Sequence, residues 1–335
     1  MIYTLSVIIE ISSIRRFCIS PEGASVIDTL QAWFNKMTLD LMSLSSEIDM
    51  YCSKFPIQIS VKEKKIGFIG WGFLEVSFHF DSEIEIECTV QKGHESYQRK
   101  LCIDEIIPFF SDNLEKYLYD LFLITNVSYP GCLSLGAGKI LLNRKKIVKK
   151  IKRLHSPFAE IFINTVTNRH IGPVLQTIPL QQSWDWFLQR TNFFEGTSKH
   201  AVDRALNALS FTVNANNHEE LLYTLIGLEA LYNNNEVNIN SIMKQIYIKT
   251  KILLQDGKDY KKSLKFMYEV RSSFIHGSLN FRNKHTFDYD NEEFNEKFYK
   301  ALMTSLSVLI ASIQKLILAD SNGIEENYSI KLIKI

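Results

Sequence analysis

The chain has 335 residues, with 38 Lys and Arg against 37 Asp and Glu, so its formal net charge is +1. This length favours two domains, and the near-neutral total excludes a global basic field of the kind that attracts nucleic acid. The hydrophobic share of 46% and the charged share of 22% are those of a globular protein with sizeable cores.

The sequence carries no signal that places it outside the cytoplasm. Its five cysteines form no C-x-x-C pair, which indicates reduced thiols and argues against a zinc site or a disulfide framework. The apolar start lacks the basic region and cleavage site of a signal peptide, and the apolar stretch 305–319 is interrupted by Gln314 and Lys315. We therefore expect a cytoplasmic protein without a membrane partner.

Strand patterns dominate the first half of the chain. Residues 2–11 are rich in β-branched and aromatic types, and residues 57–90 alternate polar and apolar side chains, which predicts antiparallel, half-exposed strands. Helical spacing appears over 24–50 and 104–125, and a further strand is expected over 131–142. The expected fold of residues 1–180 is a mixed α+β domain whose role the sequence does not indicate.

A run of seven basic residues occupies 144–153. Ile147, Ile151 and the next residue after the run, Leu154, fall at helical spacing, so the run is predicted to be a basic amphipathic helix. One interpretation is contact with an RNA phosphate backbone, and the main alternative is a solvated surface balanced by acidic residues elsewhere. A role at a membrane surface is a third and less favoured interpretation. The candidate RNA contacts are Lys145, Lys146, Lys149 and Lys150.

After the glycine and proline residues of 172–179 the pattern becomes helical. Short loops between amphipathic segments predict an antiparallel all-α bundle over 181–335. Six helices are expected. The first is short and begins at 183, and the others cover 198–214, 218–232, 240–254, a segment that ends near 276, and 292–318. The whole chain is therefore expected to be α+β.

The fifth of these helices carries Arg271 and His276, followed by Gly277. Glycine accepts the left-handed backbone that ends a helix, so His276 is expected in the last turn, where the helix dipole favours an imidazolium. Five residues at about 100° each place the two side chains about 140° apart, so they converge only if the helix distorts or a second copy contributes. Arginine for phosphate charge and histidine for proton transfer suffice to cleave a phosphodiester. The alternative is a helix-end histidine and a salt-bridged arginine.

The third helix carries Glu229 inside its apolar stripe. An unpaired carboxylate there is costly, so it is expected to pair with a cation, and Arg271 is the obvious partner. Such a pair fixes helix register, and it also holds the guanidinium in place.

Three features of the second half follow one another in a fixed order. Residues 225–232 read Leu-Ile-Gly-Leu-Glu-Ala-Leu-Tyr, the segment from Arg271 to Gly277 comes some forty residues later, and a long apolar helix follows. Together they resemble the HEPN superfamily, in particular its Apea-like branch, over roughly residues 181–320. The family often has Asn, Asp or His directly after the arginine, where this chain has Ser272.

This resemblance implies a helical domain that dimerises around the Arg–His segment. Many HEPN proteins are metal-independent ribonucleases of toxin–antitoxin or anti-phage systems, so Arg271 and His276 are the positions that match the catalytic pair. Glu229, Ser272 and Ser273 are expected in supporting roles. The implied partners are RNA, a second copy of the chain, and a neutralising antitoxin or defence protein, with no metal and no cofactor. The alternative is a non-catalytic module that binds RNA or protein, with Arg271 in a structural ion pair.

Overall fold

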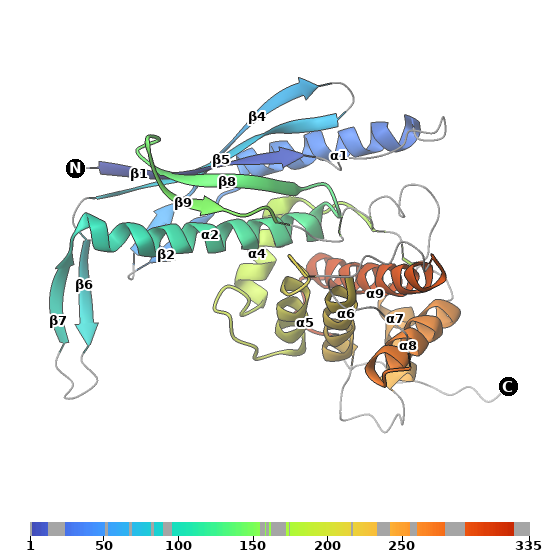
Figure 1. Ribbon diagram of the computed structural model, residues 1–335. Helices are drawn as coiled ribbons and strands as arrows, with labels where there is room; N and C mark the ends of the chain where they lie inside the picture. The colour runs from blue at the N-terminus through green and yellow to red at the C-terminus, as the bar shows by residue number, and fades with distance from the viewer. Residues whose placement is uncertain are drawn as a thin grey trace. The chain divides into compact units, whose positions relative to one another are not determined.

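The computed structural model describes residues 2–12, 24–50, 53–66, 69–81, 84–89, 96–154, 158, 161, 172–173, 175–215, 217–232, 242–254, 260–278 and 292–324. The chain forms two compact units. Unit 1 comprises Met1–Ala159 and Pro179–Gln181, and unit 2 comprises Glu160–Ile178 and Gln182–Ile335. The predicted α+β class is confirmed, because an antiparallel sheet region is followed by helices (Figure 1).

Unit 1 is built on a five-stranded antiparallel sheet. In spatial order its strands are β4 (Gln58–Ile66), β5 (Ile69–Asp81), β1 (Ile2–Ser12), β8 (Ser134–Leu142) and β9 (Lys146–Ile151). Two further hairpins are formed by β2 (Glu47–Met50) with β3 (Ser53–Pro56) and by β6 (Ile84–Thr89) with β7 (Ser96–Leu101). The predicted strands over 2–11, 57–90 and 131–142 therefore exist.

Two helices complete unit 1. Helix α1 (Ala24–Ser43) packs against β4 and β5, while α2 (Ile103–Ser128) packs against β1, β8 and β9. Phe110 of α2 contacts Phe78 and Phe80 of β5, with ring centroids 5.6 and 4.9 Å apart. Alternate residues of β1 face this core, since Leu5 and Val7 are fully buried.

The basic run 144–153 is not a helix, and that prediction was wrong. Asn143 and Arg144 have φ of 50° and 56°, and the Lys145 amide donates to the Leu142 carbonyl at 3.0 Å, which makes a type I′ hairpin turn. The run then continues as strand β9, at the edge of the sheet beside β8. The segment forms a strand rather than a helix because its backbone pairs with β8 through a ladder of hydrogen bonds.

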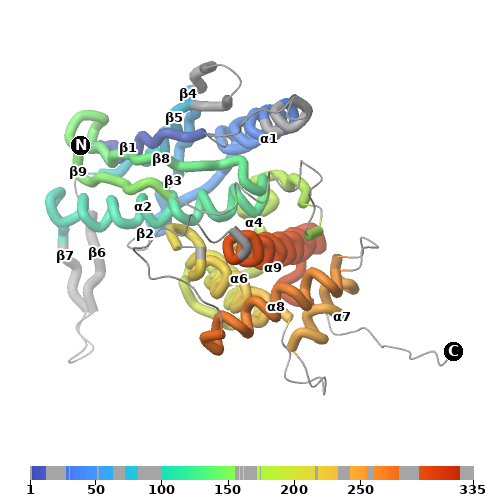
Figure 2. The backbone as a smooth tube through the Cα atoms, turned by 45° about the vertical axis from the view of Figure 1, so that its right-hand side comes forward, coloured from blue at the N-terminus to red at the C-terminus, as the bar shows by residue number. Residues whose placement is uncertain are grey.

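Unit 2 contains all the remaining helices that the structure describes. They are α4 (Leu180–Arg190, whose first two residues belong to unit 1), α5 (Ala201–Ser210), α6 (Asn217–Tyr232), α7 (Ile242–Leu254), α8 (Lys261–Ile275) and α9 (Glu292–Leu318). Helices α6, α7 and α8 all pack on α9, as Figure 2 shows. By length and composition α9 could cross a membrane, but 89% of its apolar window is buried within the protein. Such burial is typical of a core helix.

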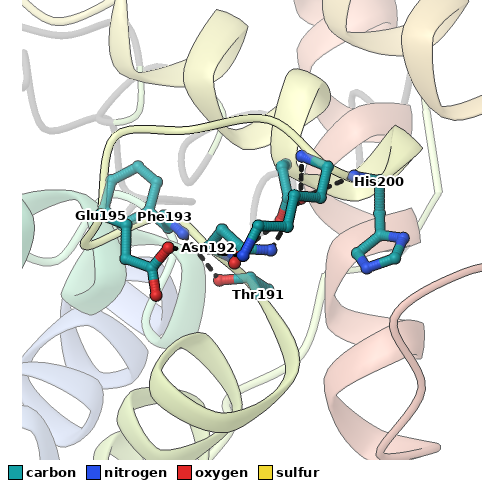
Figure 3. Close-up of polar contacts among 7 residues, drawn as sticks. Thr191, Asn192, Phe193, Glu195 and His200 are labelled. Atoms are coloured by element: carbon teal, nitrogen blue, oxygen red, sulfur yellow. Dashed lines mark hydrogen bonds and ion pairs between the residues drawn. The ribbon is translucent and has the colours of Figure 1, made fainter.

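The connection between α4 and α5 is fixed by one carboxylate. Asp203 accepts hydrogen bonds from the backbone amides of Asn192, Lys199 and His200 and from the Asn192 side chain. Figure 3 shows Asn192 and His200 at the two ends of this loop. Burial tends to raise the pKa of Asp203, but the hydrogen bonds outweigh it, so the pKa is lowered. The ionised carboxylate thus holds the start of α5 in place.

Candidate active site

Arg271 lies at the border of the buried side of α8. Leu264, Met267 and Val270 form that side, as their spacing predicts. The Arg271 Nη2 atom lies 3.1 Å from Oε1 of Glu229 on α6, and the two side chains are only 29% and 22% exposed. The predicted pairing of Glu229 with Arg271 is therefore confirmed.

Tyr268 completes this cluster. Its hydroxyl donates a 2.9 Å hydrogen bond to the same Glu229 oxygen, and the Arg271 guanidinium carbon lies 5.8 Å from its ring centroid. Burial raises the pKa of Tyr268 well above its ordinary value, and the neighbouring carboxylate raises it further, so the phenol stays protonated and donates. Sequence reasoning missed Tyr268, although its position three residues before Arg271 places both on one side of the helix.

His276 directly follows α8 as its C-cap residue, and its side chain is exposed. Gly277 follows with a φ of 69°, in the left-handed region, and its amide donates to the Phe274 carbonyl at 3.2 Å. The Ser278 amide donates to the Ser273 carbonyl at 2.9 Å, which completes a Schellman motif. The predicted helix stop at Gly277 is confirmed, and it presents His276 to solvent on a capped helix end.

An aromatic cluster anchors this end of α8. Phe274 stacks on the ring of His218 from α6 at 5.7 Å and meets Phe298 of α9 at 6.1 Å. His218 also contacts Phe294 and Phe298 at 5.9 and 4.8 Å. Burial among these rings lowers the pKa of His218, because desolvation disfavours the imidazolium. The backbone between Arg271 and His276 is thus tied to both neighbouring helices.

Within one chain the structure does not join Arg271 to His276. No hydrogen bond or ion pair links the two among the described residues, and an ideal helix separates them by about 140°. Ser272 is exposed and Ser273 is half-buried, and neither takes part in the contacts of Glu229 with Arg271 and Tyr268. The two predicted catalytic side chains therefore lie on different sides of α8.

The candidate RNA contacts of the basic run lie in unit 1, on the β8–β9 hairpin. Lys149 is held by Asp112 and Glu115 of α2. In the turn, the Nε atom of Arg144 lies 2.8 Å from Oε1 of Glu75, which is largely buried. The remaining candidates Lys145, Lys146 and Lys150 are exposed. The hairpin thus offers three of its four candidate lysines to a ligand.

Among the described residues no group of three or more His, Cys, Asp or Glu side chains is placed to hold a metal ion. Comparisons with protein-family models, with curated proteins and with solved structures find no match for this chain. The function of the chain is therefore inferred from the chemistry of the site and from the resemblance of its motifs.

Proposed function

We propose that the chain is a metal-independent endoribonuclease that cleaves RNA by attack of the 2′-hydroxyl, using Arg271 and His276. The observation that carries this proposal is a guanidinium held by Glu229 and Tyr268 on the helix that presents an exposed His276 at its end. The resemblance to HEPN proteins supports a place in a bacterial anti-phage defence or toxin–antitoxin system.

The chemistry needs a base, an acid and a stabiliser of phosphate charge. One His276 takes the proton of the 2′-hydroxyl, the 2′-oxygen bonds to phosphorus, and the bond to the 5′-oxygen breaks. A second His276 gives a proton to the leaving 5′-oxygen, and Arg271 stabilises the charge that develops on the phosphate oxygens. Ser272 or Ser273 orients the phosphate through a hydroxyl hydrogen bond. The products are a 2′,3′-cyclic phosphate and a 5′-hydroxyl.

A second copy of the chain supplies the geometry that one copy lacks. Arg271 and His276 diverge on a single α8, so both reach one phosphate only where two such helices face each other. Exposed apolar side chains border the ion pair, with Ile226 one turn before Glu229 and Ile275 next to His276, at 52% and 50% exposure. They are suited to a protein contact beside the charged pair.

A non-catalytic module that binds RNA or protein is the second candidate. It is favoured by the ion pair of Arg271 with Glu229, because a guanidinium that is already paired can have a purely structural role, which is to fix the register of α6 against α8. In this case His276 has no chemical role. The exposed Lys145, Lys146 and Lys150 of the hairpin are a further RNA contact in either candidate.

The test is incubation of the purified full-length chain with total RNA, with and without EDTA, beside the His276→Ala variant. The proposal predicts that the wild type cleaves RNA with or without EDTA and leaves DNA intact. The His276→Ala variant should not cleave RNA. Cleavage that disappears with EDTA, or a variant as active as the wild type, leaves the binding module in its place. A homodimer is checked on the same sample by sedimentation.

A further inference from the structure

Helices α7 and α8 concentrate positive charge in a chain that is near neutral overall. Together they carry seven cationic side chains and one acidic one, Glu269, whereas the whole chain has a net charge of +1. Helix α7 packs against α8, so this charge gathers in one part of unit 2. The seven are Lys244, Lys249, Lys251, Lys261, Lys262, Lys265 and Arg271.

Part of this charge shares a helix face with His276. At about 100° per residue, Lys261, Lys265, Ser272 and His276 fall within an arc of about 60°, and all four are exposed. Lys262 flanks them and is exposed as well. We call Lys261, Lys262, Lys265 and Ser272 the α8 track. At 1.5 Å per residue, Lys265 lies about 16 Å before His276 along the helix axis.

We propose that the α8 track binds the sugar–phosphate backbone of single-stranded RNA and leads it to His276. This inference rests on the proposed ribonuclease function and adds the surface that holds the substrate. Lysines spaced along a line neutralise successive phosphates and so give affinity without reading sequence. A single helix face offers one such line, which fits one strand rather than the two backbones of a duplex.

The electrostatics of the helix end explain why the track is needed. The C-terminus of α8 carries partial negative charge, which repels a phosphate next to His276. The track lysines attract the phosphates that lie along the preceding turns and so hold the strand beside the helix end. Glu269 lies on the same face, where it is 62% exposed and 3.5 Å from the ammonium group of Lys265. Removing Glu269 should therefore strengthen RNA binding, while removing the lysines should weaken it.

Binding is measured in the full-length chain carrying His276→Ala, so that no cleavage intervenes. The probe is a labelled RNA of about eight nucleotides, within the site sizes of single-strand binding grooves. Each phosphate contact to a single strand contributes about 0.7 to the slope of log affinity against log salt, so replacing Lys261, Lys262 and Lys265 with Gln should lower the slope by about 2. Glu269→Gln should raise affinity. Circular dichroism confirms that each variant is folded.

A variant with Lys36, Lys62 and Lys199 replaced by Gln is the matched control, because it removes the same charge from exposed positions outside both α8 and the β8–β9 hairpin. A larger fall in slope for the α8 variant supports the track. Equal falls would mean that net charge alone governs binding, and an unchanged slope for the α8 variant would mean that RNA binds elsewhere. Either result overturns the inference.

The binding measurements, together with the cleavage assay on the wild type, separate this inference from the proposed function. If the wild type does not cleave RNA but the α8 variant loses slope, the track stands and the ribonuclease function fails. If the wild type cleaves in a His276-dependent way but the α8 variant binds with an unchanged slope, the function stands and the track is overturned.

Discussion

The β8–β9 hairpin and helix α8 both concentrate cationic side chains, but they hold them in different environments. On the hairpin, Lys145, Lys146 and Lys150 are exposed, and the Arg144 side chain is 67% exposed beside Glu75. On α8, Arg271 is half-buried and held by a carboxylate and a phenol. A fixed guanidinium loses little freedom when it meets a phosphate, whereas exposed lysines attract phosphates over a distance. We therefore propose catalysis at the fixed guanidinium of Arg271 rather than at the exposed lysines of the hairpin.

The largest expected effect is on cleavage. His276→Ala should lower the rate by about 10²–10⁴-fold, the usual effect of losing a positioned acid or base. Arg271→Ala should lower it by about 10²–10³-fold, the usual effect of losing one group that stabilises transition-state charge. Both variants should remain folded, and His276→Ala should leave the melting temperature unchanged because the His276 side chain is exposed. Gel assays on a defined RNA give the rates.

Lys199→Gln is the control for these rates, because Lys199 is an exposed cation of the same unit that pairs only weakly with Glu195. It should cleave like the wild type. An equal fall in rate for Arg271→Ala and Lys199→Gln would show that net charge, and not the position of Arg271, supports cleavage.

The next effect concerns stability and compares the two kinds of ion pair. Glu229→Gln should destabilise unit 2 by about 1–3 kcal/mol, because it weakens a half-buried pair and its charge-assisted hydrogen bonds. Lys265→Gln, which removes the exposed pair with Glu269 on the surface of the same helix α8, should cost at most about 1 kcal/mol. Urea unfolding of both variants gives the two values. Equal losses would show that the partial burial of the Glu229–Arg271 pair adds nothing to its contribution to stability.

A third effect concerns the helix stop that presents His276. Gly277→Ala places a β-carbon on a residue with φ of 69°, which should cost about 1–2 kcal/mol although no atom lies within 4 Å of the added carbon. Gly196 has φ of 68° and equally open surroundings, so Gly196→Ala should cost about the same. Only the Gly277 variant should also slow cleavage. If Gly277→Ala and Gly196→Ala cleave RNA at the same rate, the exact position at which α8 ends does not affect cleavage.

The sequence predicted unit 2 better than unit 1 for a physical reason. Long amphipathic helices carry their own pattern, so Leu264, Met267 and Val270 revealed the buried side of α8, and the misplaced charge of Glu229 revealed its partner Arg271. The basic run satisfied helical spacing equally well, yet its backbone pairs with β8, a tertiary choice that local periodicity does not record. Tyr268 went unnoticed because a half-buried tyrosine is unremarkable until its hydroxyl is seen to reach Glu229.

The smallest expected effect separates how firmly Arg271 is held from how much charge α8 carries. Tyr268→Phe removes the hydroxyl that donates to Glu229 and leaves every charge of α8 in place. The lost hydrogen bond should cost about 0.5–1.5 kcal/mol of stability. Because Tyr268 helps to position Glu229, and through it Arg271, kcat should fall several-fold while the salt dependence of RNA binding stays the same. The lysine-to-glutamine changes on α8 should do the reverse, weakening binding more than kcat. If Tyr268→Phe changes the salt slope but not kcat, the phenol belongs to the binding surface, and the guanidinium needs no support from it to act.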